Sequence, residues 1–339
     1  MTAALRYEWR RLWSIRSTYW LIGITFGLQL AGTLLAAMGT SAVENVFDAA
    51  ETVSQIITLG AATGLSPLFT AYIIAMFGVF CFGHEYRYGM IRATLTAVPD
   101  RRAVFAAKAL ITALLAAVMS VGCSLIGMFS SLLFLDTRGA LSSDTVWYVV
   151  LGAALFTVLF GLCGMAFAAL VRNQTGALAM VLLVPLVAEN IIALILRIVS
   201  QDGGDAVELA KVLPFDAGAQ MYASSFADEL NRFLGYDPLG AVGGGLVFTA
   251  FTALLVAGAF ALFLTRDARV PAAVSQGPLV NRTPHGTQPV GSANMPWGVL
   301  LDAMGSAGPP LTSSPGCRSG VVRPWPRPAG VFYGRQSFL

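Results

Sequence analysis

The feature that most constrains this chain is a series of uninterrupted apolar runs, each about 20 residues long or longer. A helix of that length crosses a hydrocarbon core about 30 Å thick, because each helical residue adds about 1.5 Å. The composition agrees, since 56% of the 339 residues are hydrophobic and only 12% are charged. An ordinary soluble domain has about 25% charged residues. These observations exclude a soluble globular protein and predict an all-α, polytopic membrane protein.

Turn and charge signals divide the apolar runs into six transmembrane helices. Tyr19, Trp20, Trp147 and Tyr148 fall at the ends of two of them, where amphipathic rings prefer the headgroup layer. The first span is longer than the apolar region of a cleaved signal peptide, so we expect it to be retained. The six predicted spans are residues 19–38, 59–82, 109–135, 147–171, 177–199 and 242–264.

The basic residues predict the orientation of these spans. The N-terminal segment, every second connection and the segment after the last span contain 17 of the 21 lysines and arginines, whereas the alternate connections contain three. Acidic residues show the opposite distribution. Since lysine and arginine concentrate in cytoplasmic loops, both termini should be cytoplasmic, in a multi-pass protein of the plasma membrane.

Two further segments flank the spans. In residues 4–16, four apolar side chains share one face of a helix, which favours an interfacial helix on the inner leaflet; a disordered basic leader is the alternative. Residues 266–339 contain 11 of the 16 prolines and no sustained hydrophobic period, which predicts a disordered tail. We expect no function for this tail, although a proline-rich ligand is an alternative. The apolar face of residues 4–16 consists of Leu5, Trp9, Leu12 and Trp13.

Several kinds of chemistry lack the residues that they require. The four cysteines are widely spaced, and His84-Glu85 is not followed by a second histidine, because position 88 is Tyr88. A Gly-Lys-Ser/Thr phosphate-binding loop and a Gly-x-Ser-x-Gly nucleophile motif are both missing. We therefore expect no enzyme activity, no metal and no cofactor in this chain. The net charge of +3 gives no reason to expect a nucleic-acid partner.

The connection at residues 83–103 carries a recognisable pattern. It resembles the corresponding loop in the permease subunits of type-2 ATP-binding cassette transporters. The stretch from Arg172 to Glu189, which includes Pro185, and the stretch Leu213-Pro214-Phe215 are also similar, so that the resemblance covers residues 1–265. The residues that carry the loop pattern are Glu85, Tyr86, Arg87, Gly89, Arg92, Thr94, Leu95 and Pro99.

This resemblance implies that residues 1–265 form a transmembrane permease domain. Its loop at 83–103 would contain a coupling helix that docks on a separate cytoplasmic ATP-binding subunit, where ATP hydrolysis takes place. The permease would act as a homodimer or beside a second permease. It would export a lipid, a drug-like compound or a peptide.

The loop also has a physical interpretation of its own. Gly89 permits a tight bend, Pro99 ends the preceding helix and Asp100 can cap the next one. Residues 90–98 are long enough for about two helical turns. Glu85 and Arg87 would anchor the loop through charge-assisted hydrogen bonds. The alternative is that the arginines are only topology anchors that bind lipid phosphate.

Polar and small residues within the spans suggest further roles. Glu189 lies in the fifth span, where a carboxylate should face the bundle interior and either line a substrate path or fix helix packing. Residues 200–241 should form short external helices that act either as a lid dipping between spans five and six or as a small cap. Small-residue motifs at Gly23/Gly27 and Gly60/Gly64 allow close helix packing, within one chain or at a dimer interface.

Two other functional classes are left beside an exporter. One is a stand-alone membrane protein with an immunity or regulatory role and no transport cycle. The other is a secondary transporter, which would usually show duplicated halves and several intramembrane charges. Neither feature is evident in this sequence, so the secondary transporter ranks last.

Overall fold

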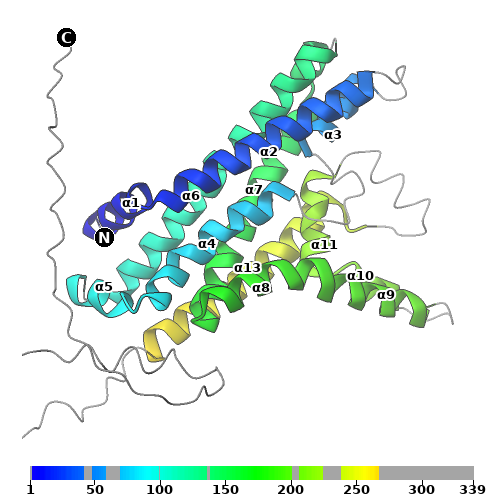
Figure 1. Cartoon of the computed structure of the whole chain (residues 1–339). Helices are drawn as coiled ribbons and strands as arrows, with labels where there is room; N and C mark the ends of the chain where they lie inside the picture. Colours follow the sequence, from blue (N-terminus) through cyan, green and yellow to red (C-terminus); the bar gives the residue numbers. More distant parts are fainter. Residues whose placement is uncertain are drawn as a thin grey trace, which may run out of the picture. The chain divides into compact units, whose positions relative to one another are not determined.

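A computed structural model describes residues 2–41, 48–58, 69–98, 100–135, 138–200, 206–223 and 238–266. These residues are almost entirely helical, and no β-strand occurs among them (Figure 1). All of them belong to one compact unit, Met1–Ala273. The expectation of an all-α fold is therefore confirmed. The predicted tail lies outside the described residues, apart from Arg266 at the end of the last helix.

Among the described residues, five helices are long and apolar enough to cross a membrane. Four of them are α2, α6, α7 and α13, and the fifth is a continuous helix from Gln174 to Leu196 that begins in α8, passes through the π-helix η2 and continues into α9. The bounds are α2 Arg16–Ser41, α6 Arg101–Phe134, α7 Asp144–Val171, α8 Gln174–Leu183, η2 Val184–Ala188, α9 Glu189–Ser200 and α13 Gly240–Arg266.

These helices coincide with five of the six expected spans. The remaining one, 59–82, overlaps helix α4 (Phe69–Arg87), and residues 59–68 lie outside the described part of the chain. Shorter elements connect the long helices. They are α1 Thr2–Ser14, α3 Ala49–Thr58, α5 Ile91–Ala97, η1 Arg138–Ser142, α10 Ala206–Ala210, α11 Pro214–Ala219 and η3 Gln220–Tyr222.

Helix α7 lies at the centre of the fold and contacts α4, α6 and α13. Glycines let α4 and α7 approach closely: a Cβ at Gly78 would overlap the carbonyl oxygen of Gly161, and one at Gly164 would overlap that of Ala75. On the other side of α7, Phe156 stacks on Phe248 of α13 with ring centroids 5.0 Å apart. This packing holds the end of α4 and the following loop in a fixed position.

Two short helices between α9 and α13, α11 and η3, enter the bundle. Phe215 of α11 is fully buried, and its ring lies 5.3 Å from those of both Phe160 and Phe248. Tyr222 of η3 is also buried, 5.1 Å from Phe156. The short helices expected here are thus present, and α11 and η3 pack between α7 and α13. The rest of the expected external segment, residues 201–205 and 224–237, lies outside the described part.

Candidate coupling site

Helix α5 is held at both ends by local features that the sequence indicates. Gly89 has a φ of +65°, a conformation that favours glycine, and it lets the chain turn from α4 into α5. At the other end, Asp100 accepts hydrogen bonds from the backbone N–H groups of Arg102 and Ala103, at 3.1 and 3.3 Å, and thereby caps α6. The expected bend, two-turn helix and cap are all confirmed.

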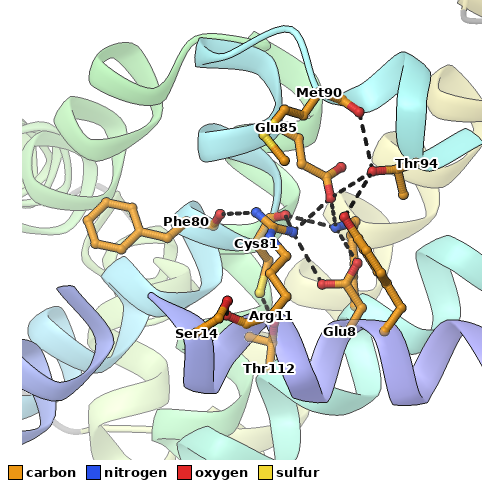
Figure 2. Close-up of polar contacts among 11 residues, drawn as sticks. Glu8, Arg11, Ser14, Phe80, Cys81, Glu85, Met90, Thr94 and Thr112 are labelled. Carbon is orange, nitrogen blue, oxygen red and sulfur yellow. Dashed lines mark hydrogen bonds and ion pairs between the residues drawn. The ribbon is translucent and has the colours of Figure 1, made fainter. Parts of the chain in front are cut away.

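Before this turn, Glu85 joins a set of charged side chains that we call the buried charge cluster: Glu8, Arg11, Glu85 and Lys108 (Figure 2). Lys108 Nζ lies 2.7 Å from Glu85 Oε1 and 2.7 Å from Glu8 Oε1. Arg11 Nη1 lies 2.7 Å from the same Glu85 oxygen and 3.2 Å from Glu8 Oε2. Both cations also donate to the carbonyl oxygen of Cys81. Each cation therefore bridges two carboxylates and α4.

The cluster is nearly inaccessible to solvent. Glu85 and Lys108 are 0% exposed, and Glu8 is 4% exposed. Burying an isolated charge costs several kcal/mol, but two cations among two carboxylates offset one another and leave no net charge. Burial alone would lower the pKa of Arg11, yet the carboxylates of Glu85 and Glu8 raise that pKa above its ordinary value. Arg11 therefore remains charged.

Thr94 connects α5 to this cluster. Its side chain is buried, and its hydroxyl lies 3.4 Å from Glu85 Oε1 and 3.3 Å from the carbonyl oxygen of Met90. The hydroxyl of Tyr7, on α1, lies 3.5 Å from the same Thr94 oxygen. Four helices thus meet at one point: α1 through Glu8 and Arg11, α4 through Glu85, α5 through Thr94 and α6 through Lys108.

Two other residues of the expected coupling set attach the loop to the helix bundle. The Tyr86 ring stacks near Phe82 of α4, and the Arg172 guanidinium lies 5.9 Å from its centroid. Leu95 packs against the main hydrophobic core from α5. These contacts place the turn between α7 and α8 next to the end of α4.

The remaining expected residues do not join the cluster. Arg87 is exposed, with its guanidinium 5.7 Å from the centroid of the Tyr88 ring, and it forms no ion pair with any residue that the structure describes. Arg92 lies in α5, but its side chain is outside the described part, as is the whole of Pro99. Of the two expected anchors of the loop, Glu85 forms charge-assisted hydrogen bonds, with Arg11 and Lys108, whereas Arg87 forms no ion pair with a described residue.

Sequence reasoning does not find three members of the cluster. It assigns Glu8 and Arg11 to a basic interfacial segment, and it uses Lys108 as a topology signal and as the end of the loop pattern, without a charged partner. One sequence signal is available, because Glu8 is the sole acidic residue among the first 18 and lies three positions before Arg11. A lysine at the start of a long apolar helix is a second signal, since it requires a partner or a polar environment.

A second polar contact lies at the opposite part of the bundle. Glu189 is buried, and its two carboxylate oxygens accept hydrogen bonds from the backbone N–H groups of Phe215, at 2.8 Å, and Asp216, at 3.1 Å. The preceding turn contains Pro185 and forms the π-helix η2; proline has no backbone N–H group, and a local π-helical adjustment satisfies the carbonyl groups that this leaves free. Glu189 faces the bundle interior as expected, and it holds the first turn of α11.

The described residues contain no group of histidine, cysteine, aspartate and glutamate side chains that could hold a metal ion. Comparisons with models of known protein families and with curated proteins find no match for this chain.

Proposed function

We propose that this chain is the transmembrane subunit of a type-2 ATP-binding cassette exporter, driven by a separate cytoplasmic ATPase. The observation that carries the proposal is the connection of α5, through Thr94 and Glu85, to a buried charge cluster shared by α1, α4 and α6. The resemblance of residues 83–103 to the loop of such permeases supports the same assignment.

The contacts between α5 and the buried charge cluster can transmit a displacement of α5 to the membrane-spanning helices. Helix α5 has only seven residues and is fixed at Gly89 and at the cap of α6. A displacement of α5 would move Thr94 and Glu85 together, and the two cations would have to follow, because separating buried opposite charges is expensive. Lys108 would then carry the displacement into α6, a helix of 34 residues that crosses the whole bundle.

In this proposal α4 is the sixth span, and the end of the molecule that contains α1 and α5 faces the cytoplasm. The exported compound would be a lipid, a drug-like molecule or a peptide, as the resemblance implies. At Gly23 and Gly27 of α2, no atom lies within 4 Å of the position that a Cβ would occupy, which leaves that helix face open for a second permease subunit. Surrounding lipids would cover the other apolar helix faces.

The test is site-specific photo-crosslinking of the full chain in native membranes. A crosslinker at Ala93, an exposed residue of α5, should capture an ATP-binding protein, whereas one at Gly139, exposed at the other end of the bundle, should not. If the folded chain captures no ATP-binding protein from either position, the proposal is contradicted and a stand-alone immunity or regulatory protein is favoured.

A matched pair of substitutions tests the coupling itself. Thr94→Val removes the buried hydroxyl beside Glu85, whereas Thr96→Val makes the same change at an exposed position of α5. We expect Thr94→Val to reduce transport-linked ATP hydrolysis several-fold at unchanged abundance, and Thr96→Val to leave it near the wild-type rate. Equal effects of the two substitutions would show that the contact with Glu85 does not transmit the signal.

A further inference from the structure

An open cavity of about 750 Å³ lies beside the buried charge cluster, between α1, the start of α2 and the end of α4. Its walls are rich in arginine and hydroxyl groups. The lining residues that matter here are Tyr7, Arg10, Arg16, Ser17, His84 and Tyr88.

The charge that this cavity presents is positive. Arg11 and Glu85 also line it, but they are bound to each other and to the rest of the cluster. Arg10 and Arg16 are exposed and form no ion pair with any described residue. Arg10 and Arg16 therefore provide the uncompensated positive charge of the cavity.

Aromatic side chains place the cavity at a membrane surface. Trp9, Trp13 and Tyr19 form an exposed group next to it, with successive ring centroids 5.7 Å apart, and Trp20 is 74% exposed. Tryptophan and tyrosine prefer the headgroup layer. The membrane-spanning helix α2 begins at Arg16, so the cavity lies at the depth where its apolar segment starts.

We propose that this cavity binds the phosphate group of an anionic phospholipid from the adjoining leaflet. Arg10 and Arg16 would bind the phosphate oxygens, because a guanidinium offers paired donors that match phosphate geometry. The Ser17 hydroxyl, which has no partner among the described residues, would donate a further hydrogen bond. The acyl chains would extend along the exposed aromatic face of α1 and the first turns of α2.

The experiment uses the purified full-length chain and native mass spectrometry, with phosphatidylglycerol and phosphatidylcholine of identical acyl chains as probes. The double variant Arg10→Gln/Arg16→Gln removes both free arginines. The control Arg6→Gln/Arg102→Gln removes the same charge from exposed positions outside the cavity. Because direct guanidinium–phosphate hydrogen bonds are charge-assisted, the cavity variant should bind the first phosphatidylglycerol at least about tenfold more weakly, and clearly more weakly than the control.

Binding of phosphatidylglycerol that is unchanged in the cavity variant, or equally weakened in the control, would overturn the proposal.

The source of the phosphate is tested by thermal unfolding in detergent. Phosphatidylglycerol should raise the Tm of the wild-type chain, and inorganic phosphate at about 10 mM should not. An equal rise with inorganic phosphate would overturn the assignment to a lipid. Neither measurement needs an ATPase, so its failure would leave the proposed coupling role untouched.

Discussion

Each cation of the buried charge cluster contacts both carboxylates, so the loss of one cation leaves two acids with a single partner. We predict that Lys108→Met lowers the free energy of unfolding by about 3–5 kcal/mol, the usual effect of breaking a buried ion pair from one side. Unfolding in mixed detergent micelles measures this change. Lys211→Met is the matched control, because Lys211 pairs with Glu208, whose side chain is 67% exposed. An exposed pair contributes about 0–1 kcal/mol.

A second substitution distinguishes charge balance from packing. In the double variant Lys108→Met/Glu8→Gln, Arg11 and Glu85 are left as a neutral pair at 2.7 Å. Part of the lost stability should return, since the uncompensated carboxylate has been removed. If the double variant is less stable than Lys108→Met alone, the loss comes from packing around the aliphatic part of Lys108.

Glu189 carries the second prediction at this scale. Its carboxylate accepts two backbone hydrogen bonds from α11, whereas a glutamine in its place offers one carbonyl oxygen and turns an amide donor toward the other N–H group. Glu189→Gln should therefore raise amide hydrogen exchange of Phe215 and Asp216 by about 5–100-fold, because leaving a buried N–H group without its acceptor costs about 1–3 kcal/mol. Hydrogen exchange in the rest of the chain should stay unchanged. The control variant, Glu208→Gln, should leave hydrogen exchange unchanged throughout α11.

Individual residues also show what the sequence can and cannot predict. The neighbouring sequence is enough to predict three local features. These are the turn at Gly89, the helix cap at Asp100 and the inward orientation of Glu189, because a carboxyl group is costly to expose to the hydrocarbon core. The cluster does not follow in this way, because Glu8 and Lys108 are 100 residues apart in the sequence. Their meeting depends on how α1 packs on α6, which no local period encodes. The same limit explains why the sequence pattern favours Arg87 as an anchor of the loop, although it lies on the exposed side of the turn.

At the scale of single elements, α1 has two functional faces. The expected apolar face is present, and Trp9 and Trp13 on it are 47% and 43% exposed, as suits a helix against lipid. A neighbouring face carries the buried Glu8, whose carboxylate is paired with Lys108 and Arg11. In the proposed function, α1 would therefore link the inner leaflet to α5 through the buried charge cluster.

The contact between α4 and α7 supplies the prediction for elements. Gly164→Ala would push a methyl group into the carbonyl of Ala75 on α4, which is backbone and cannot turn aside. We predict a loss of about 1–3 kcal/mol in unfolding free energy, the range for overpacking a core. Gly258→Ala on α13 is the control, because no atom of another element lies within 4 Å of the added carbon. Thermal unfolding of the detergent-solubilised chain compares the two variants, and a smaller loss for Gly164→Ala than for Gly258→Ala would contradict this packing.

At the scale of the whole molecule, successive long helices place their connections alternately at two ends of the bundle. One end has the turn after α4, with Arg87, and the turn after α7, where Arg172 approaches Tyr86 of α4. The other end has α3 in contact with η1. Basic residues gather at the first end, which agrees with the distribution that predicts a cytoplasmic location for it.

This arrangement predicts the labelling of single cysteines by an impermeant thiol reagent in intact cells. In a variant without the four native cysteines, a cysteine at Asp48, Gly139 or Glu208 should react from outside, because these exposed positions lie in connections expected to be external. A cysteine at Tyr88 or Ala93 should react only after the membrane is permeabilised, since both are exposed at the α5 end. Reaction at Ala93 in intact cells would place α5 outside, where no cytoplasmic ATPase could reach it. That result would contradict the proposed coupling role of the buried charge cluster.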